Sequence, residues 1–255
     1  WLAVPFSEED GGFDGGLIDI MVIMQLFGKG LIVEQYLANV VMAGGVLKRT
    51  ATAKQKERWL QPMIAGEMQT ALAFAEPQGR YDVANLLTTA TADRDGWVID
   101  GKKSMVFNGG NADLLVVPAR TSGAQSDAAG ISLFAVAAND EGVSVQAYPT
   151  VDGHHAADVE LQSVRVGADA LLGDADKAFD VLDAVDAHDR VETIRHLSCC
   201  RLLPAGRGRR LHLPDEIHID GAFFHSQLAA QQVQGLYPGA AFKDGGDFTV
   251  PGNGF

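Results

Sequence analysis

The chain has 255 residues, which is enough for one large domain or two modest ones. Its hydrophobic content of 47% and charged content of 21% are ordinary for a globular protein. The net charge of −13 argues against a nucleic-acid surface, which needs clustered Lys and Arg, and the apolar run from Leu17 to Leu26 is too short to span a bilayer.

The cysteine content gives a weak indication of compartment. The two cysteines are adjacent, Cys199 and Cys200, and form neither a disulfide framework nor a zinc pattern. This usage is consistent with a reducing cytoplasm. The chain begins at Trp1 without a Met or a leader pattern, so we expect the natural N-terminus to be missing.

Residues 1–68 are predicted to be a partial helical domain. Ile18, Met21, Val22 and Leu26 recur at helical spacing, and residues 31–47 show the same apolar spacing. Another helix is predicted to start after a capping box, Thr52 with Gln55. It either ends near Pro62 or continues to Gly66 with a kink.

Residues 69–173 are predicted to be a central β-domain. Residues 97–99 and 102–107 are predicted to be two strands around a tight turn at Asp100–Gly101. Further short strands are expected at residues 114–117, 131–137, 143–147 and 158–166. Several short strands at this spacing suggest a small barrel or sandwich.

The remaining chain changes character. Residues 174–190 are interpreted as the start of a C-terminal helical domain, with a helix predicted at 178–187. Residues 191–255 are an atypical tail, rich in Pro and Gly, in which acidic and basic residues balance. We keep two interpretations of this tail: a divergent or disordered end, or a shifted reading frame that begins near residues 188–195.

The segment from Ala71 to Asn111 resembles the central β-domain signature of the acyl-CoA dehydrogenase family. Three further blocks, at residues 1–16, 54–68 and 159–173, resemble the family in the same order. The resemblance covers roughly residues 1–187. It implies an α+β fold, with a helical N-terminal part, a central β-barrel-like domain and the start of a C-terminal helical domain before the irregular tail.

The resemblance also implies a reaction. Such proteins are FAD-dependent oxidoreductases of fatty acid metabolism that oxidise acyl-CoA to trans-2-enoyl-CoA. A carboxylate removes the α-proton, flavin N5 takes the β-hydride, and an electron-accepting flavoprotein reoxidises the flavin. The family's catalytic Glu normally lies in the C-terminal helical bundle. No residue is assigned to that role, so this chain alone is expected to be inactive.

The resemblance places the cofactor contacts on three short stretches. Phe74 and Ala75 stand where main-chain groups reach the ring, and Tyr81 takes the place of a Ser in the loop that follows. The second flavin segment corresponds to Met105, Val106 and Phe107. The sequence departs from the family here: Ala75 lacks the usual hydroxyl, and Phe107 replaces a Thr and cannot hydrogen-bond flavin N5.

Two features resemble the small-subunit branch, in which pimeloyl-CoA dehydrogenase-like chains pair with a larger dehydrogenase subunit: Glu76-Pro77 followed by Arg80-Tyr81-Asp82, and the loss of the Thr at Phe107. We therefore expect a homo- or hetero-oligomer. Two alternatives stay open: a non-catalytic structural partner of a larger subunit, and a truncated product without function.

Several of these residues also have a structural interpretation. Glu76, beside a strand end and a Pro, is expected to satisfy main-chain N–H groups, and Asp82 to be a turn or cap residue. Met105 and Phe107 alternate as on any half-buried strand. His154 and His155 are adjacent in an extended segment and point apart, so no metal site is predicted.

Overall fold

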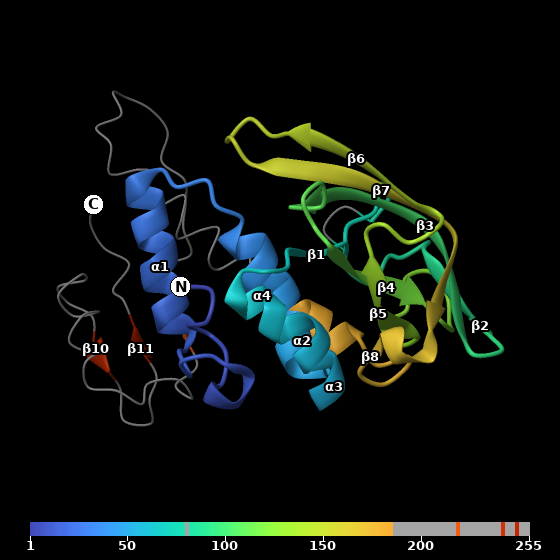
Figure 1. Cartoon of the computed structure of the whole chain (residues 1–255), viewed down its shortest axis with the longest axis horizontal. Coiled ribbons are helices and arrows are strands. Elements are labelled where there is room, and N and C mark those ends of the chain that lie inside the picture. Colours follow the sequence, from blue (N-terminus) through green and yellow to red (C-terminus); the bar gives the residue numbers. More distant parts are fainter. Residues whose placement is uncertain (80–81, 186–217, 220–240, 243–247, 250–255) are drawn as a thin grey trace.

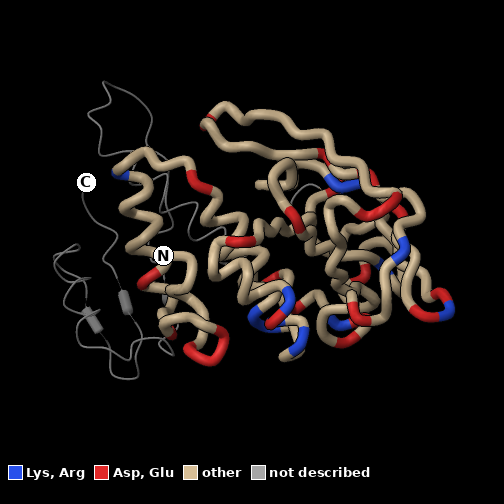
Figure 2. The backbone as a smooth tube through the Cα atoms, viewed as in Figure 1, with Lys and Arg blue, Asp and Glu red and all other residues tan. Residues whose placement is uncertain are grey.

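In the computed structural model, residues 1–79, 82–185, 218–219, 241–242 and 248–249 are described. A helical part lies beside a curved sheet, and the two are joined by the short strand β1, Thr70–Leu72 (Figure 1). Asp and Glu recur along the loops and strand ends, with Lys and Arg between them (Figure 2). Among the described residues, none of the helices has the length and apolar character needed to cross a bilayer.

The helical part contains three helical stretches. The first is α1, Leu17–Gly30. In the second, a π-helical segment, η2 (Leu37–Ala43), runs directly into α2 (Gly44–Thr50). In the third, α3 (Ala53–Gln55), the π-helical η3 (Lys56–Leu60) and α4 (Gln61–Ala65) follow without a break. A 3₁₀ turn, η1 (Glu8–Asp10), precedes them.

The predicted start of the third stretch is confirmed. The Thr52 hydroxyl accepts from the Gln55 N–H at 3.4 Å, and the Gln55 side chain accepts from the Thr52 N–H at 2.8 Å. The helix continues through Pro62 and ends at Gly66, which has a left-handed φ of 80°. The Gln61 N–H reaches back to the Lys56 carbonyl in a wider, π-type turn just before the proline, which has no N–H of its own.

An eight-stranded sheet follows, in the order β6-β7-β3-β2-β4-β5-β8, with β1 paired to β4. Its ends, β6 and β8, do not pair, so the barrel-like domain is an open curved sheet rather than a closed barrel. The longer strands are β2 (Thr89–Asp93), β3 (Gly96–Phe107), β4 (Leu114–Arg120), β5 (Ile131–Ala137), β6 (Val143–Pro149) and β7 (His155–Gly167).

The chain then leaves the sheet. A 3₁₀ turn, η4 (Ala168–Ala170), leads to β8 (Leu171–Leu172), and a helical segment is described at 179–185. The rest of the helix predicted at 178–187 lies outside the described residues. In the tail, β9 (His218–Ile219), β10 (Ala241–Phe242) and β11 (Phe248–Thr249) form a small antiparallel sheet.

The tight turn predicted at Asp100–Gly101 is wrong. β3 is one strand of 12 residues that passes through this dipeptide, and the hairpin turn lies at Arg94–Asp95 between β2 and β3. Asp100–Gly101 instead lies within β3 opposite a bulge in β7. Between the pairs Ile99–Val164 and Gly101–Leu161, β3 has one residue and β7 has two, Gln162 and Ser163. Gly101 has a φ of 159°, and a Cβ there would lie 2.3 Å from the Thr88 hydroxyl.

Two hydrophobic clusters share the central strands. In β4, Leu114 and Val116 face an outer cluster with the helices, whereas Leu115 and Val117 face an inner cluster within the curved sheet. All seven residues of β4 are buried. The helical part and the sheet therefore pack on opposite faces of the same strand, which explains why its sequence is a continuous apolar run.

The close approach of Gly101 to Thr88 predicts that Gly101→Ala lowers the free energy of unfolding by roughly 2 kcal/mol or more, since the new Cβ meets Thr88 and takes a φ that side chains avoid. Urea denaturation measures this. Gly45→Ala is the matched control: Gly45 lies in α2, and its nearest neighbour is the movable Arg49 guanidinium. Equal stability of Gly101→Ala and the parent chain would contradict this close approach.

Candidate functional site

The structure brings two of the three predicted cofactor segments together. Residues 73–76 extend β1 beyond its last strand residue, and the Ser104 N–H in β3 donates to the Ala75 carbonyl at 2.9 Å. Phe74–Ala75 and Met105–Phe107 are therefore neighbours. Tyr81 lies outside the described residues.

Phe74 leaves its main chain available. Its half-buried side chain packs against the outer cluster, so the ring is part of the core between helices and sheet. Among the described residues, the Phe74 N–H and C=O have no hydrogen-bond partner. The main-chain groups of a half-buried residue can bond to water or to a ligand. This position suits a ligand with a polar edge.

The second segment presents its side chains alternately. Val106 is 2% exposed and belongs to the inner cluster, so its side chain is closed to a ligand. Met105 is 52% exposed, and Phe107 is half-buried. A bulge between Lys103 and Val106 gives Met105 a left-handed φ of 50°. The apolar surface of this segment is therefore carried by Met105 and Phe107.

A carboxylate from the neighbouring strand supports this bulge. Asp158 Oδ1 in β7 accepts from the Met105 N–H at 3.2 Å and from the Tyr148 hydroxyl at 3.1 Å. Burial, and then the Asp158 carboxylate, raise the pKa of Tyr148, so this phenol is a neutral donor at physiological pH.

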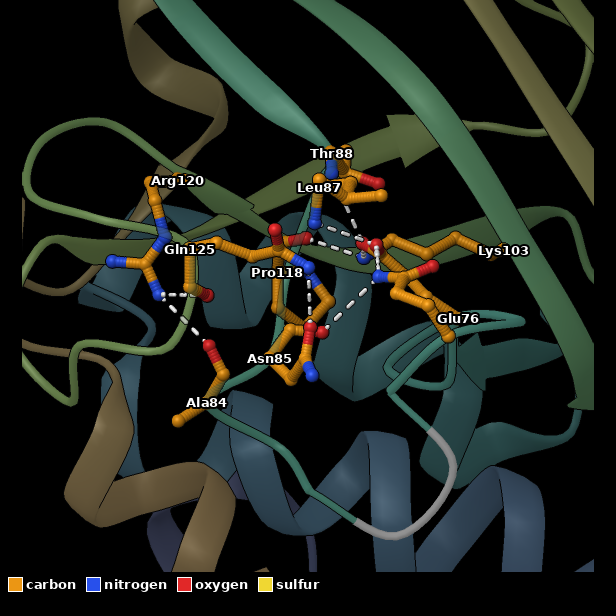
Figure 3. A network of polar contacts seen from close by, with 10 residues as sticks. Glu76, Ala84, Asn85, Leu87, Thr88, Lys103, Pro118, Arg120 and Gln125 are labelled. Carbon is orange, nitrogen blue, oxygen red and sulfur yellow. Dashed lines mark hydrogen bonds and ion pairs between the residues drawn. The ribbon is translucent and has the colours of Figure 1, made fainter.

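A buried ion pair joins the two segments (Figure 3). Lys103 Nζ lies 2.7 Å from Glu76 Oε1, and the two side chains are 0% and 1% exposed. Lys103 Nζ also donates to the Pro118 carbonyl of β4 at 2.8 Å. The ammonium group thus has two oxygen acceptors in the interior of the sheet.

Glu76 also closes the loop that follows it. Its carboxylate accepts from the Leu87 N–H at 2.7 Å, the Thr88 N–H at 3.1 Å and the Gln78 amide at 2.7 Å. The structural interpretation of Glu76 is therefore confirmed. That of Asp82 is confirmed as well, because its Oδ1 accepts from the Ala84 N–H at 3.0 Å in a turn.

Arg120, at the end of β4, holds the other side of this loop (Figure 3). It is 7% exposed, and its guanidinium donates to main-chain carbonyls alone among the described residues. The acceptors are Ser122 and Ala129 for Nη1 and Ala84, Gln125 and Asp127 for Nη2. One planar side chain therefore ties the loop 77–88 to the loop 121–130.

The protonation of the ion pair follows from its burial. Burial alone would raise the pKa of the Glu76 carboxyl, but the charge and hydrogen bonds of Lys103, with the main-chain donors, lower it to about 2. Burial lowers the pKa of Lys103 to about 8, against the attraction of Glu76. The pair is therefore ionised at neutral pH.

Sequence reasoning missed three residues that shape this site: Lys103, Asn108 and Arg120. Asn108 is buried, with a left-handed φ of 61°, and its amide donates to the Gln69 side chain at 3.1 Å and the Thr70 carbonyl at 3.3 Å. For Arg120 the available signal was an Arg at the end of an otherwise apolar strand, since such a charge is rarely buried unless it has partners. The strand of Lys103 is polar around it and gives no such signal.

The ion pair predicts a loss of stability in acid. The folded pKa of Glu76 is below its ordinary value of 4.5, so its contribution is present above that pH and is lost as the pH falls towards 2. Lys103 stays protonated throughout this window. Relative to the Glu76→Gln/Lys103→Met double variant, the parent chain should lose roughly 2 kcal/mol between about pH 7 and about pH 3.

Urea denaturation of both proteins across this pH range provides the measurement. The double variant is the reference because it lacks both charges but keeps side chains of similar size. A stability difference that does not change with pH would contradict the ionised buried pair.

Comparison with known proteins agrees with this architecture. The model of the acyl-CoA dehydrogenase N-terminal domain matches residues 1–67, and that of the acyl-CoA dehydrogenase middle domain matches residues 71–164. Acyl-CoA dehydrogenase FadE29 from Mycobacterium tuberculosis is 28% identical over 225 residues, which cover 85% of this chain and 53% of FadE29.

Two solved structures extend the comparison. Butyryl-CoA dehydrogenase from Megasphaera elsdenii gives a TM-score of 0.72 at 22% identity, over 78% of this chain and 54% of that one, which shows the shared fold. The ChsE4–ChsE5 complex from Mycobacterium tuberculosis gives 0.66 at 25% identity, over 76% and 50%. The chain spans about half the length of the relatives that it matches.

The two matching models adjoin each other in the order in which the helical part and the sheet follow one another in the structure. The match at residues 71–164 includes both juxtaposed segments, the buried ion pair and the bulge of β3 at Met105. The chain belongs to the acyl-CoA dehydrogenase family.

Proposed function

We propose that this chain is a subunit of an FAD-dependent acyl-CoA dehydrogenase that oxidises acyl-CoA to trans-2-enoyl-CoA. The observation that carries the proposal is the juxtaposition of Phe74–Ala75 with Met105–Phe107, held by the hydrogen bond from Ser104 to Ala75. It combines a half-buried peptide without a partner among the described residues with an exposed apolar side chain, as a planar ring with a polar edge requires.

The residues present fit such a ring through their main chain. The Phe74 peptide is available to hydrogen-bond the polar edge, and Met105 offers apolar contact with a face of the ring. Phe107 stands at the edge of the proposed site. Bound FAD supplies hydride acceptance from the β-carbon of the substrate. What these residues do is hold and orient the ring and shield it from water. Tyr81 is proposed to contribute a hydroxyl from the adjoining loop.

We further propose that the chain works with a larger dehydrogenase subunit, as in the pimeloyl-CoA dehydrogenase small-subunit branch. Ala75 and Phe107 lack the hydroxyls expected at a self-sufficient flavin site. The likeness to the ChsE4–ChsE5 complex supports a two-subunit assembly. In this assembly an electron-accepting flavoprotein completes the turnover.

A second function is favoured by the same substitutions. The half-buried Phe107 ring fills a position where a flavin site needs a small hydroxyl. In this alternative the chain is a structural partner that completes the assembly without holding its own flavin. The two functions differ in flavin content, which can be measured directly.

The test is to purify the chain with its larger partner subunit and to measure flavin per protomer from the visible absorbance and the protein concentration. The proposed function requires one flavin for this chain in addition to that of the partner, and bleaching of the flavin by acyl-CoA. Flavin in the partner alone would leave the structural role.

Phe107→Thr is expected to increase flavin retention, because it replaces an apolar ring by a hydroxyl at the edge of the proposed site. One hydrogen bond to a bound group contributes about 1 kcal/mol, so we expect roughly a fivefold decrease in the dissociation constant for FAD, measured by fluorescence titration. Phe13→Thr is the matched control, because Phe13 is 72% exposed on the helical part. Equal affinity in Phe107→Thr and the control would show that Phe107 does not limit binding.

A further inference from the structure

We propose that Glu76 and Lys103 are positioning residues, which fix the separation of the two segments that flank the ring in the proposed function. The inference rests on the proposed function only for the role of the two segments. Their relative geometry can be tested without flavin. Both side chains are buried, so neither charged group is exposed to a substrate in solution.

The first argument is adjacency. Glu76 directly follows Phe74–Ala75, and Lys103 precedes Met105 by two residues. β1 pairs with β4 rather than with β3, so no strand ladder aligns the two segments. Within the described chain, residues 73–76 and 103–107 are joined by the bond from Ser104 to Ala75 and by the ion pair. The buried Asn108 amide fixes the far ends of the same strands, through Gln69 and the Thr70 carbonyl. Next to Phe74–Ala75, the spacing therefore depends on the ion pair and the bond from Ser104.

The second argument is the number of elements that meet at the pair. Lys103 is held by the Pro118 carbonyl in β4, and Glu76 by the N–H groups of Leu87 and Thr88 before β2. Each charged group is therefore fixed from a second direction. A side chain with several fixed partners has one orientation, and it transmits that orientation to the segment beside it.

The third argument is energetic. The free-energy cost of moving two charges out of water offsets most of the attraction between them. A buried pair is therefore often no more stabilising than apolar residues of the same volume. Stability alone does not explain an ion pair with 0% and 1% exposure. A directional contact between two segments that share no ladder does explain it, because ionic hydrogen bonds are short and geometrically selective.

The experiment measures amide hydrogen exchange in the flavin-free chain for the parent and for Glu76→Gln/Lys103→Met. The double variant removes both charges at nearly constant volume. We expect the Ser104 amide to exchange at least about tenfold faster while the amides of Val117 and Phe134 in the inner cluster keep their rates. Lys102→Met is the matched control: Lys102 is adjacent but 70% exposed, in a surface pair with Glu160.

A second variant covers the case in which the double variant does not fold. Glu76→Asp keeps both charges and shortens the link by one methylene, and we expect faster exchange at Ser104 here as well. Unchanged exchange at Ser104 in a folded double variant, or in Glu76→Asp, overturns the proposal. A role in stability alone would accelerate all amides together instead, which also overturns it.

Flavin measurements on the same proteins connect the inference to the function. We expect about a tenfold weaker FAD affinity and a changed visible spectrum in the double variant, with no change in Lys102→Met. If the parent protein holds no flavin even with its partner subunit, the proposed function is wrong. The exchange rate at Ser104 still decides whether the pair positions the two segments.

Discussion

The fold depends on burying one strand on both of its faces. β4 pairs with β1 over residues 114–116, touches β2 at Arg120 and pairs with β5 along its whole length. Its alternate side chains enter the outer and inner clusters. Removal of this strand would separate the helices from the sheet and leave β1 without its ladder. The proposed site is built on the edge of this arrangement, where β1 continues beyond its pairing with β4.

Charged side chains are buried at two places beside this apolar strand, and each of them joins two segments of the chain. The Glu76–Lys103 pair joins the extension of β1 to β3, and Arg120 joins two loops at the end of β4. A buried charge is tolerated only when its hydrogen-bonding capacity is filled, and here carbonyls and a carboxylate fill most of it. The main chain of Phe74, by contrast, has no such partner among the described residues. The same small region thus combines closely fixed polar groups with one peptide left open.

The sequence predicted features that depend on local chemistry. The capping box of Thr52 and Gln55 and the turn at Asp82 depend on contacts within a few residues, and both are present. The prediction of a turn at Asp100–Gly101 was wrong because this dipeptide, which favours a hairpin turn, lies within β3 opposite a bulge in β7, and β7 is distant in sequence. The burial of Lys103 was not predicted for the same reason: its partner Glu76 is 27 residues away, and nothing local marks Lys103 as buried. Of the six predicted cofactor residues, five lie together and Tyr81 is outside the described part, so their role stays a prediction.

The exposure of Met105 has a chemical consequence for redox conditions. The chain has six methionines, and Met105 is exposed, whereas Met24, Met42 and Met63 are buried and Met21 and Met68 are partly covered. An accessible thioether is readily converted to the sulfoxide, which is polar and chiral. At Met105 this would place a polar group on the apolar surface of the second segment. Oxidants would therefore modify the Met105 sulfur, beside Phe107, before they reached the methionines of the packed interior.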